Sequence, residues 1–192
     1  MQEKIPENID FLSENINLGV RISRSSIEDF PIISDRDMHT KEEKLLFILG
    51  SWNNRDSTHL DISIEGVFDC PEALVHRPGE ITVDYQKAET IFDSLKKENE
   101  ESLSLSLLGN VHTHPYTEEE LKRHPATPTS HDVEGWKMEA VDSLEQRKIP
   151  QVFGIVSRNE ENGSMQLALY HIVKGRDGTF YHKPIKDWEY GE

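Results

Sequence analysis

VHTHPYTEEELKRHPATPTSHD runs from Val111 to Asp132 and separates two kinds of secondary structure. The sequence before it alternates leucine with serine, which is typical of a β-strand. Three prolines interrupt the stretch itself, and a continuous helix cannot pass through them. The sequence after it carries apolar residues at helical spacing. We therefore expect a strand that ends at the histidines and a helix that begins near Asp132.

On either side of this stretch, strand-like and helix-like segments follow one another. Strands are predicted over residues 18–23, 42–50, 59–68, 102–114, 151–157 and 165–173. Helices are predicted over 82–101 and 130–148, with a brief one over 24–30, and we expect turns at 53–57 and 175–178 and a loop over 69–80. This order predicts the α/β class, with a single mixed β-sheet flanked by helices. We expect a loose N-terminal extension over residues 1–17 and one domain over 18–192.

The charge balance narrows the classes of partner. Thirty-six acidic residues against 21 basic ones give a net charge of −15, which argues against nucleic acid and anionic membranes and favours a partner with a basic face. The chain has no apolar run of membrane-spanning length and its start has no signal-peptide pattern, so we expect a cytoplasmic protein. Cys70 is the only cysteine, so a metal ion would need His, Asp or Glu ligands.

The histidines and the aspartate of this stretch form a candidate metal site. Strand alternation places His112 and His114 on one face, and Asp132 lies at the expected helix start, where the helix dipole favours a carboxylate. Two imidazoles and one carboxylate suit a tetrahedral zinc ion that keeps its fourth position for water. The alternative is that the H-x-H pair occurs by chance and that Asp132 is only a helix N-terminal acid.

Two segments together resemble a known motif. VHTHP followed by PTSHD resembles the H-x-H-P and [S/T]-x-x-D elements of the JAB/MPN+ zinc metalloproteases, called the JAMM motif. The remaining element of that motif is a glutamate that opens an early apolar strand, and EKLLFILG places Glu43 there, with Glu42 as its nearest competitor. The resemblance covers roughly residues 18–172 and implies a cytidine-deaminase-like fold. Here the spacer before Thr129 is longer than in the family, and threonine replaces the usual serine.

The resemblance also implies a role for each motif residue. His112, His114 and Asp132 would bind Zn²⁺, Glu43 would act as the general base, and Thr129 would donate a hydrogen bond to the oxyanion. The implied activity is a zinc-dependent isopeptidase or peptidase. It would cleave conjugates of a ubiquitin-like modifier at its C-terminal tail, or process a modifier precursor, and a companion subunit could activate it. The alternatives are a catalytically silent MPN-type scaffold and a DNA-associated relative of the RadC kind, which the acidic charge disfavours.

The remaining features of the stretch have plainer interpretations. Residues 116–127 would border the cleft and form either a flap that contacts substrate or an inert surface loop. We expect His124 to be solvated and His131 to be exposed at the helix start, although His131 could also assist the metal. Trp136 fits the apolar stripe of the helix and is expected in the core.

Overall fold

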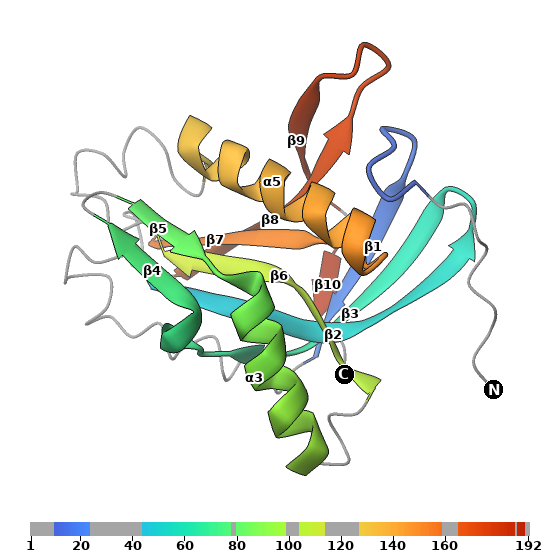
Figure 1. Ribbon diagram of the computed structural model, residues 1–192. Helices are drawn as coiled ribbons and strands as arrows, with labels where there is room; N and C mark the ends of the chain where they lie inside the picture. Colours follow the sequence, from blue (N-terminus) through green and yellow to red (C-terminus); the bar gives the residue numbers. More distant parts are fainter. Residues whose placement is uncertain are drawn as a thin grey trace.

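The computed structural model describes residues 10–23, 44–77, 80–98, 104–113, 127–158, 165–186 and 188–190. Within them the chain forms a mixed α/β fold, as the sequence predicts (Figure 1). A curled eight-stranded sheet has the order β10-β1-β3-β2-β6-β7-β8-β9, and β4 and β5 form a separate two-stranded sheet. None of the helices in these ranges is long and apolar enough to cross a membrane.

The strands of the large sheet are β1 (Asn17–Ile22), β2 (Leu45–Asp56), β3 (His59–Phe68), β6 (Ser106–Thr113), β7 (Val152–Arg158), β8 (Met165–Lys174), β9 (Phe180–Pro184) and β10 (Trp188–Tyr190). The remaining elements are the short helix η2 (Pro71–Ala73), the hairpin strands β4 (Leu74–Arg77) and β5 (Glu80–Val83), and the helices α3 (Tyr85–Glu98) and α5 (Ser130–Gln146). β1 pairs in parallel with β3 and β10, and β6 with β7, while the other neighbours in the sheet are antiparallel.

Alternation along β2 divides the core between the two faces of the sheet. Leu46 and Ile48 join a large apolar cluster with residues of β1, β3 and β6. Leu45 and Phe47 point the other way, toward Ala88 and Phe92 of α3. Helix α5 covers β7 and β8 through a third cluster, which contains Trp136, Ala140, Phe153, Ile155 and Ile172. Both helices cover the same face of the sheet, because Phe47 on the α3 side pairs with Asn110, and Asn110 pairs with Phe153 on the α5 side.

Three local expectations were wrong. The turn expected over 53–57 is shorter and lies later, because β2 continues to Asp56 and the turn consists of Ser57 and Thr58. The Asp56 carboxylate closes it by accepting hydrogen bonds from Thr58 N at 2.7 Å and Thr58 Oγ1 at 2.8 Å. The loop expected over 69–80 instead contains η2 and β4, and the helix expected from residue 82 begins at Tyr85, because Thr82 and Val83 pair with β4. The brief helix expected over 24–30 lies outside the described residues.

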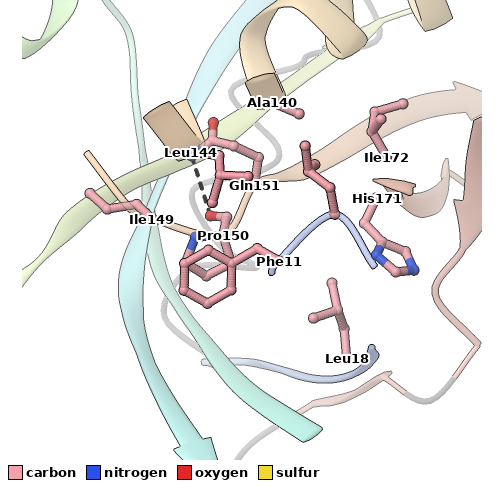
Figure 2. Close-up of a pocket in the computed structure, with 10 residues that line it drawn as sticks. Phe11, Leu18, Ala140, Leu144, Ile149, Pro150, Gln151, His171 and Ile172 are labelled. Atoms are coloured by element: carbon pink, nitrogen blue, oxygen red, sulfur yellow. Dashed lines mark hydrogen bonds between the residues drawn. The ribbon is translucent and has the colours of Figure 1, made fainter. Parts of the chain in front are cut away.

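The first described residues pack against the sheet. Residues 1–9 of the expected loose extension are outside the described ranges, whereas Phe11, Leu12 and Ile16 are buried. The Phe11 ring packs edge-on against the Trp52 ring, and the two ring centroids are 5.1 Å apart. Figure 2 shows Phe11 and Leu18 bordering a small pocket, together with Ala140 and Leu144 of α5. Its lining also includes Leu12, Ile149, Pro150, Gln151, His171 and Ile172, and none of the candidate site residues that the structure describes.

Candidate metal centre

A bulge in β6 decides which face His112 occupies. The pairing of β2 with β6 shifts between Ile48 and Leu49, whose partners are Gly109 and Leu107. The extra residue, Leu108, packs into the large cluster on the face away from α3, while Leu107 faces α3. Alternation then resumes with Asn110 and His112 on the helix-covered face, as their contacts with residues of α5 show. Without the bulge, His112 would point away from α5.

Gly109 is required for this bulge. Its φ angle is 137°, a conformation that residues with a side chain rarely adopt, and a Cβ atom there would lie 1.9 Å from the carbonyl oxygen of Val152. The close approach lets β6 pair in parallel with β7, so that His112 lies beside Ile155. The glycine therefore helps to set the face on which the candidate ligand lies.

His112 is held in a largely apolar environment at the end of β6. It is 6% exposed, and it is paired with Leu45 in the neighbouring strand β2, on the side of β6 opposite β7. Its ring centroid lies 5.9 Å from that of Trp136. Trp136 is 3% exposed and stacks on Phe153, with ring centroids 5.1 Å apart. Its expected position in the core is therefore confirmed. This packing limits the rotation of the imidazole.

Asp132 and Thr129 form a capping box at the start of α5. Thr129 is the N-cap, and its Oγ1 accepts a hydrogen bond from the backbone N–H of Asp132 at 3.2 Å. Asp132 Oδ2 accepts in return from Thr129 N at 2.6 Å and from Thr129 Oγ1 at 2.8 Å. One carboxylate oxygen is thereby fixed on the threonine. The other, Oδ1, faces β6.

The structure brings His112 and Asp132 together although they are twenty positions apart in the chain. His112 Nε2 lies 3.2 Å from Asp132 Oδ1, and the two side chains are only 7% and 12% exposed. Two ligand atoms bound to one tetrahedral zinc ion, each at roughly 2.0–2.2 Å, lie about 3.3–3.5 Å apart. The donor types and their separation therefore fit one edge of a zinc tetrahedron. The same separation also suits a direct ion pair without metal.

Glu43 and His114, the other two members of the expected set, lie outside the described residues. Each is the covalent neighbour of a described residue, Lys44 or Thr113. These two neighbours are joined by a pair of hydrogen bonds, from Lys44 N to Thr113 Oγ1 and from Thr113 N to Lys44 O, both 2.9 Å. The start of β2 and the end of β6 therefore meet beside His112.

The described ranges contain no group of three or more His, Cys, Asp or Glu side chains placed to hold a metal ion. Since His114 and Glu43 lie outside these ranges, this finding concerns only part of the expected set. His131, the histidine beside Asp132, is exposed. His124 and residues 116–126 of the spacer also lie outside the described ranges.

The sequence did not predict a buried polar cluster behind this site. Asn110 Nδ2 lies 3.0 Å from the Tyr85 hydroxyl and 2.8 Å from Glu139 Oε2, and the Tyr85 hydroxyl donates to the same Glu139 oxygen at 2.9 Å. We call these three residues the polar triangle. Arg147 borders it, with its guanidinium 5.4 Å from the Tyr85 ring and a hydrogen bond to Glu89. The available signal was Asn110, a lone amide among the buried positions of LLGNVHT.

Burial dominates the electrostatics of the polar triangle. It raises the pKa of Glu139 to about 8, while hydrogen bonds from Tyr85 and Asn110 and the charge of Arg147 oppose the rise. Part of Glu139 still reaches solvent, but its carboxyl group is enclosed. Burial also raises the pKa of Tyr85 well above its usual value. At neutral pH the polar triangle is therefore mainly uncharged, and the neighbouring Arg147 carries a positive charge.

No protein-family model matches the chain, and no curated protein matches its sequence. The resemblance to the JAB/MPN+ metalloproteases therefore rests on the motif residues alone.

Proposed function

We propose that this chain is a zinc-dependent peptidase or isopeptidase with the JAB/MPN fold. Its substrate would be the C-terminal tail of a ubiquitin-like modifier, either in a conjugate or in a precursor. His112, His114 and Asp132 would bind the ion, and Glu43 would act as the general base. The observation that carries the proposal is the 3.2 Å approach of His112 Nε2 to Asp132 Oδ1.

Two features make this approach more than a surface ion pair. Both side chains are nearly buried, so their donor atoms are held in a site that is shielded from water. Each side chain is also positioned by its own local structure. Strand pairing positions His112, and the capping box positions Asp132. Preorganised ligands of this kind are what a catalytic metal site requires.

The hydrogen bonds between Lys44 and Thr113 support the remaining assignments. They join the backbone one residue after Glu43 to the backbone one residue before His114. Consecutive Cα atoms are only about 3.8 Å apart, so a site shared by these residues and His112 needs no long-range rearrangement of the chain. This agrees with the motif order of glutamate, histidine pair and aspartate.

The reaction would be hydrolysis of an amide bond. Bound zinc would polarise the scissile carbonyl and make water a stronger nucleophile. Glu43 would accept a proton from the attacking water and pass it to the amine nitrogen as the C–N bond breaks. The products are a carboxylate at the modifier tail and a free amine. Thr129 would donate a hydrogen bond to the oxyanion. Because a hydroxyl has only one proton, Thr129 would then have to give up the hydrogen bond that it donates to Asp132 Oδ2.

The cellular setting is also part of the proposal. A cytoplasmic location fits a chain with a single cysteine. The net charge of −15 suits a modifier with a basic face, and nucleic acid is disfavoured. Activation by a companion subunit is compatible with the motif.

Substitution of Glu43 tests the catalytic part of the proposal. Glu43→Gln should keep zinc, because the residue acts on water and is not a ligand, and it should lose most cleavage of a modifier–peptide fusion. Glu42→Gln is the matched control and should retain turnover. Unchanged cleavage in Glu43→Gln would remove it as the base. Zinc binding without cleavage by the wild-type protein on any modifier fusion would favour the scaffold alternative.

A further inference from the structure

The polar triangle joins three elements at one point. Tyr85 opens α3, Asn110 lies in β6 and Glu139 lies in the middle of α5. The three polar atoms lie within 2.8–3.0 Å of one another. Hydrogen bonds at these distances fix direction as well as separation, which apolar contacts do not. The triangle therefore restrains how α5 can slide or rotate on β6.

The triangle and the candidate metal site use the same strand and the same helix. Asn110 is two residues before His112, on the same face and about 7 Å along the strand. Glu139 is seven residues after Asp132, two helical turns or about 10 Å along the helix and on nearly the same side. Helix α5 is thus attached to β6 at two points, Asp132 on His112 and Glu139 on Asn110. Trp136 fills the space between them.

Stability alone does not account for these residues. Asn110 is 1% exposed, and within the described part of the chain its Oδ1 has no hydrogen-bond partner, which costs free energy. The enclosed Glu139 carboxyl has a pKa raised to about 8 by burial, so folding is opposed by its loss of charge at neutral pH. Apolar residues of similar volume often make a protein as stable or more stable at such positions.

We propose that Asn110 and Glu139, together with Tyr85, are positioning residues that set the placement of Asp132 opposite His112. Their hydrogen bonds specify one rotation and one height of α5 on β6, and the candidate ligands are in contact only in that register. The consequence for zinc affinity rests on the proposed function. The consequence for the contact between His112 and Asp132 does not.

The test replaces the whole triangle by apolar residues of similar size, Tyr85→Phe, Asn110→Leu and Glu139→Met in one protein. The metal-free protein is assayed by thermal unfolding and by the ¹⁵N signals of the His112 ring, which report its contact with Asp132. Binding of Zn²⁺ is then measured by competition with a chelator. We expect unchanged or higher thermal stability, shifted His112 signals, and zinc affinity lower by roughly 10-fold or more, as for other residues that orient metal ligands.

Ser143→Ala is the matched control. Ser143 is fully buried on the same helix, and its hydroxyl donates to Ile149 O at 3.0 Å, away from the candidate site. Its loss should lower stability while the His112 signals and zinc affinity stay as in the wild-type protein. Glu139→Gln should also keep the wild-type His112 signals and zinc affinity, because the glutamine amide oxygen can accept hydrogen bonds from Tyr85 and Asn110.

Wild-type His112 signals and zinc affinity in the folded triple variant would overturn the proposal. Equal shifts in Ser143→Ala would also overturn it, since any loss of packing on α5 would then have the same effect. If the triple variant does not fold, Tyr85→Phe decides, with shifted His112 signals supporting the role and unchanged signals contradicting it. A wild-type protein that binds no zinc would defeat the proposed function, while the His112 signals would still decide the positioning role.

Discussion

Thr129 and Asp132 hold each other through three hydrogen bonds at the start of α5, with Asp132 Oδ2 2.8 Å from the Thr129 hydroxyl. This leaves Asp132 Oδ1 as the oxygen that faces His112. The threonine was expected to act on the substrate. In the structure it caps the helix and is hydrogen-bonded to a candidate ligand, and its role toward substrate stays a prediction.

These two roles of Thr129 give different results on substitution. Thr129→Ala should destabilise the protein by ~1 kcal/mol in urea unfolding, as loss of an N-cap does. It should also weaken zinc binding, because Asp132 loses two of its restraints. Thr129→Ser should behave like the wild-type protein in both assays. A fall in turnover alone, with zinc affinity and stability unchanged, would assign the residue to the oxyanion and not to Asp132.

The enclosed carboxyl group of Glu139 predicts a pH-dependent difference between two proteins. Its pKa rises from 4.5 in the unfolded chain to about 8 in the folded one. Between these values the folded protein binds one more proton, so this group makes the protein less stable as pH rises. Gln does not titrate, so the stability advantage of Glu139→Gln over wild type should grow from pH 5 to pH 8 and then level off. The full shift corresponds to an advantage on the order of 5 kcal/mol.

Urea unfolding of both proteins at pH 5, 6, 7, 8 and 9 measures this difference directly. Titrating groups elsewhere in the chain contribute equally to the two proteins and cancel. Arg147 borders the polar triangle and opposes the rise in the pKa of Glu139, so in an Arg147→Met background the difference should keep growing to a higher pH before it levels off. A difference that does not change with pH would mean that the Glu139 carboxyl is ionised in the folded protein throughout this range.

Gly109 should not tolerate a side chain. Gly109→Ala places a Cβ atom against the Val152 carbonyl in a backbone conformation that alanine rarely adopts, so we expect a loss of ~3 kcal/mol or more. Gly135→Ala is the matched control. That glycine lies in α5 and, apart from its chain neighbours and the nearby helix backbone, no atom of the described residues lies within 4 Å of a Cβ placed there, so alanine should stabilise the helix by roughly 0.5–1 kcal/mol. Thermal unfolding measures the stability of both variants. Similar stability changes in the two variants would contradict the bulge assignment.

The sequence predicted the elements with strong periodicity. The apolar stripe around Trp136 placed the start of α5 correctly, and the alternation before His112 predicted β6, although this strand begins at Ser106 and not at residue 102. The bulge at Gly109 could not be predicted, because it depends on how β6 meets the carbonyl of Val152 in β7. Short β4 and β5 are likewise defined by pairing with each other and not by an apolar pattern.

The same limit applies to the site. A short motif identified His112 and Asp132, and the structure brings these two into contact. The motif says nothing of Asn110 and Glu139, which are 29 positions apart and meet only through packing of α5 on the sheet. Contacts of this kind arise from tertiary structure, so residues that orient a ligand are harder to find from one sequence than the ligand itself.

Zinc binding tests the central claim most directly. The purified wild-type chain, stripped with a chelator and titrated with Zn²⁺, should bind about one ion per chain. The double variant His112→Ala/His114→Ala should lose this site, whereas His59→Ala, a substitution in an exposed histidine at the start of β3, should keep it. A wild-type chain that binds no zinc, or a double variant that binds as the wild type does, would contradict the account.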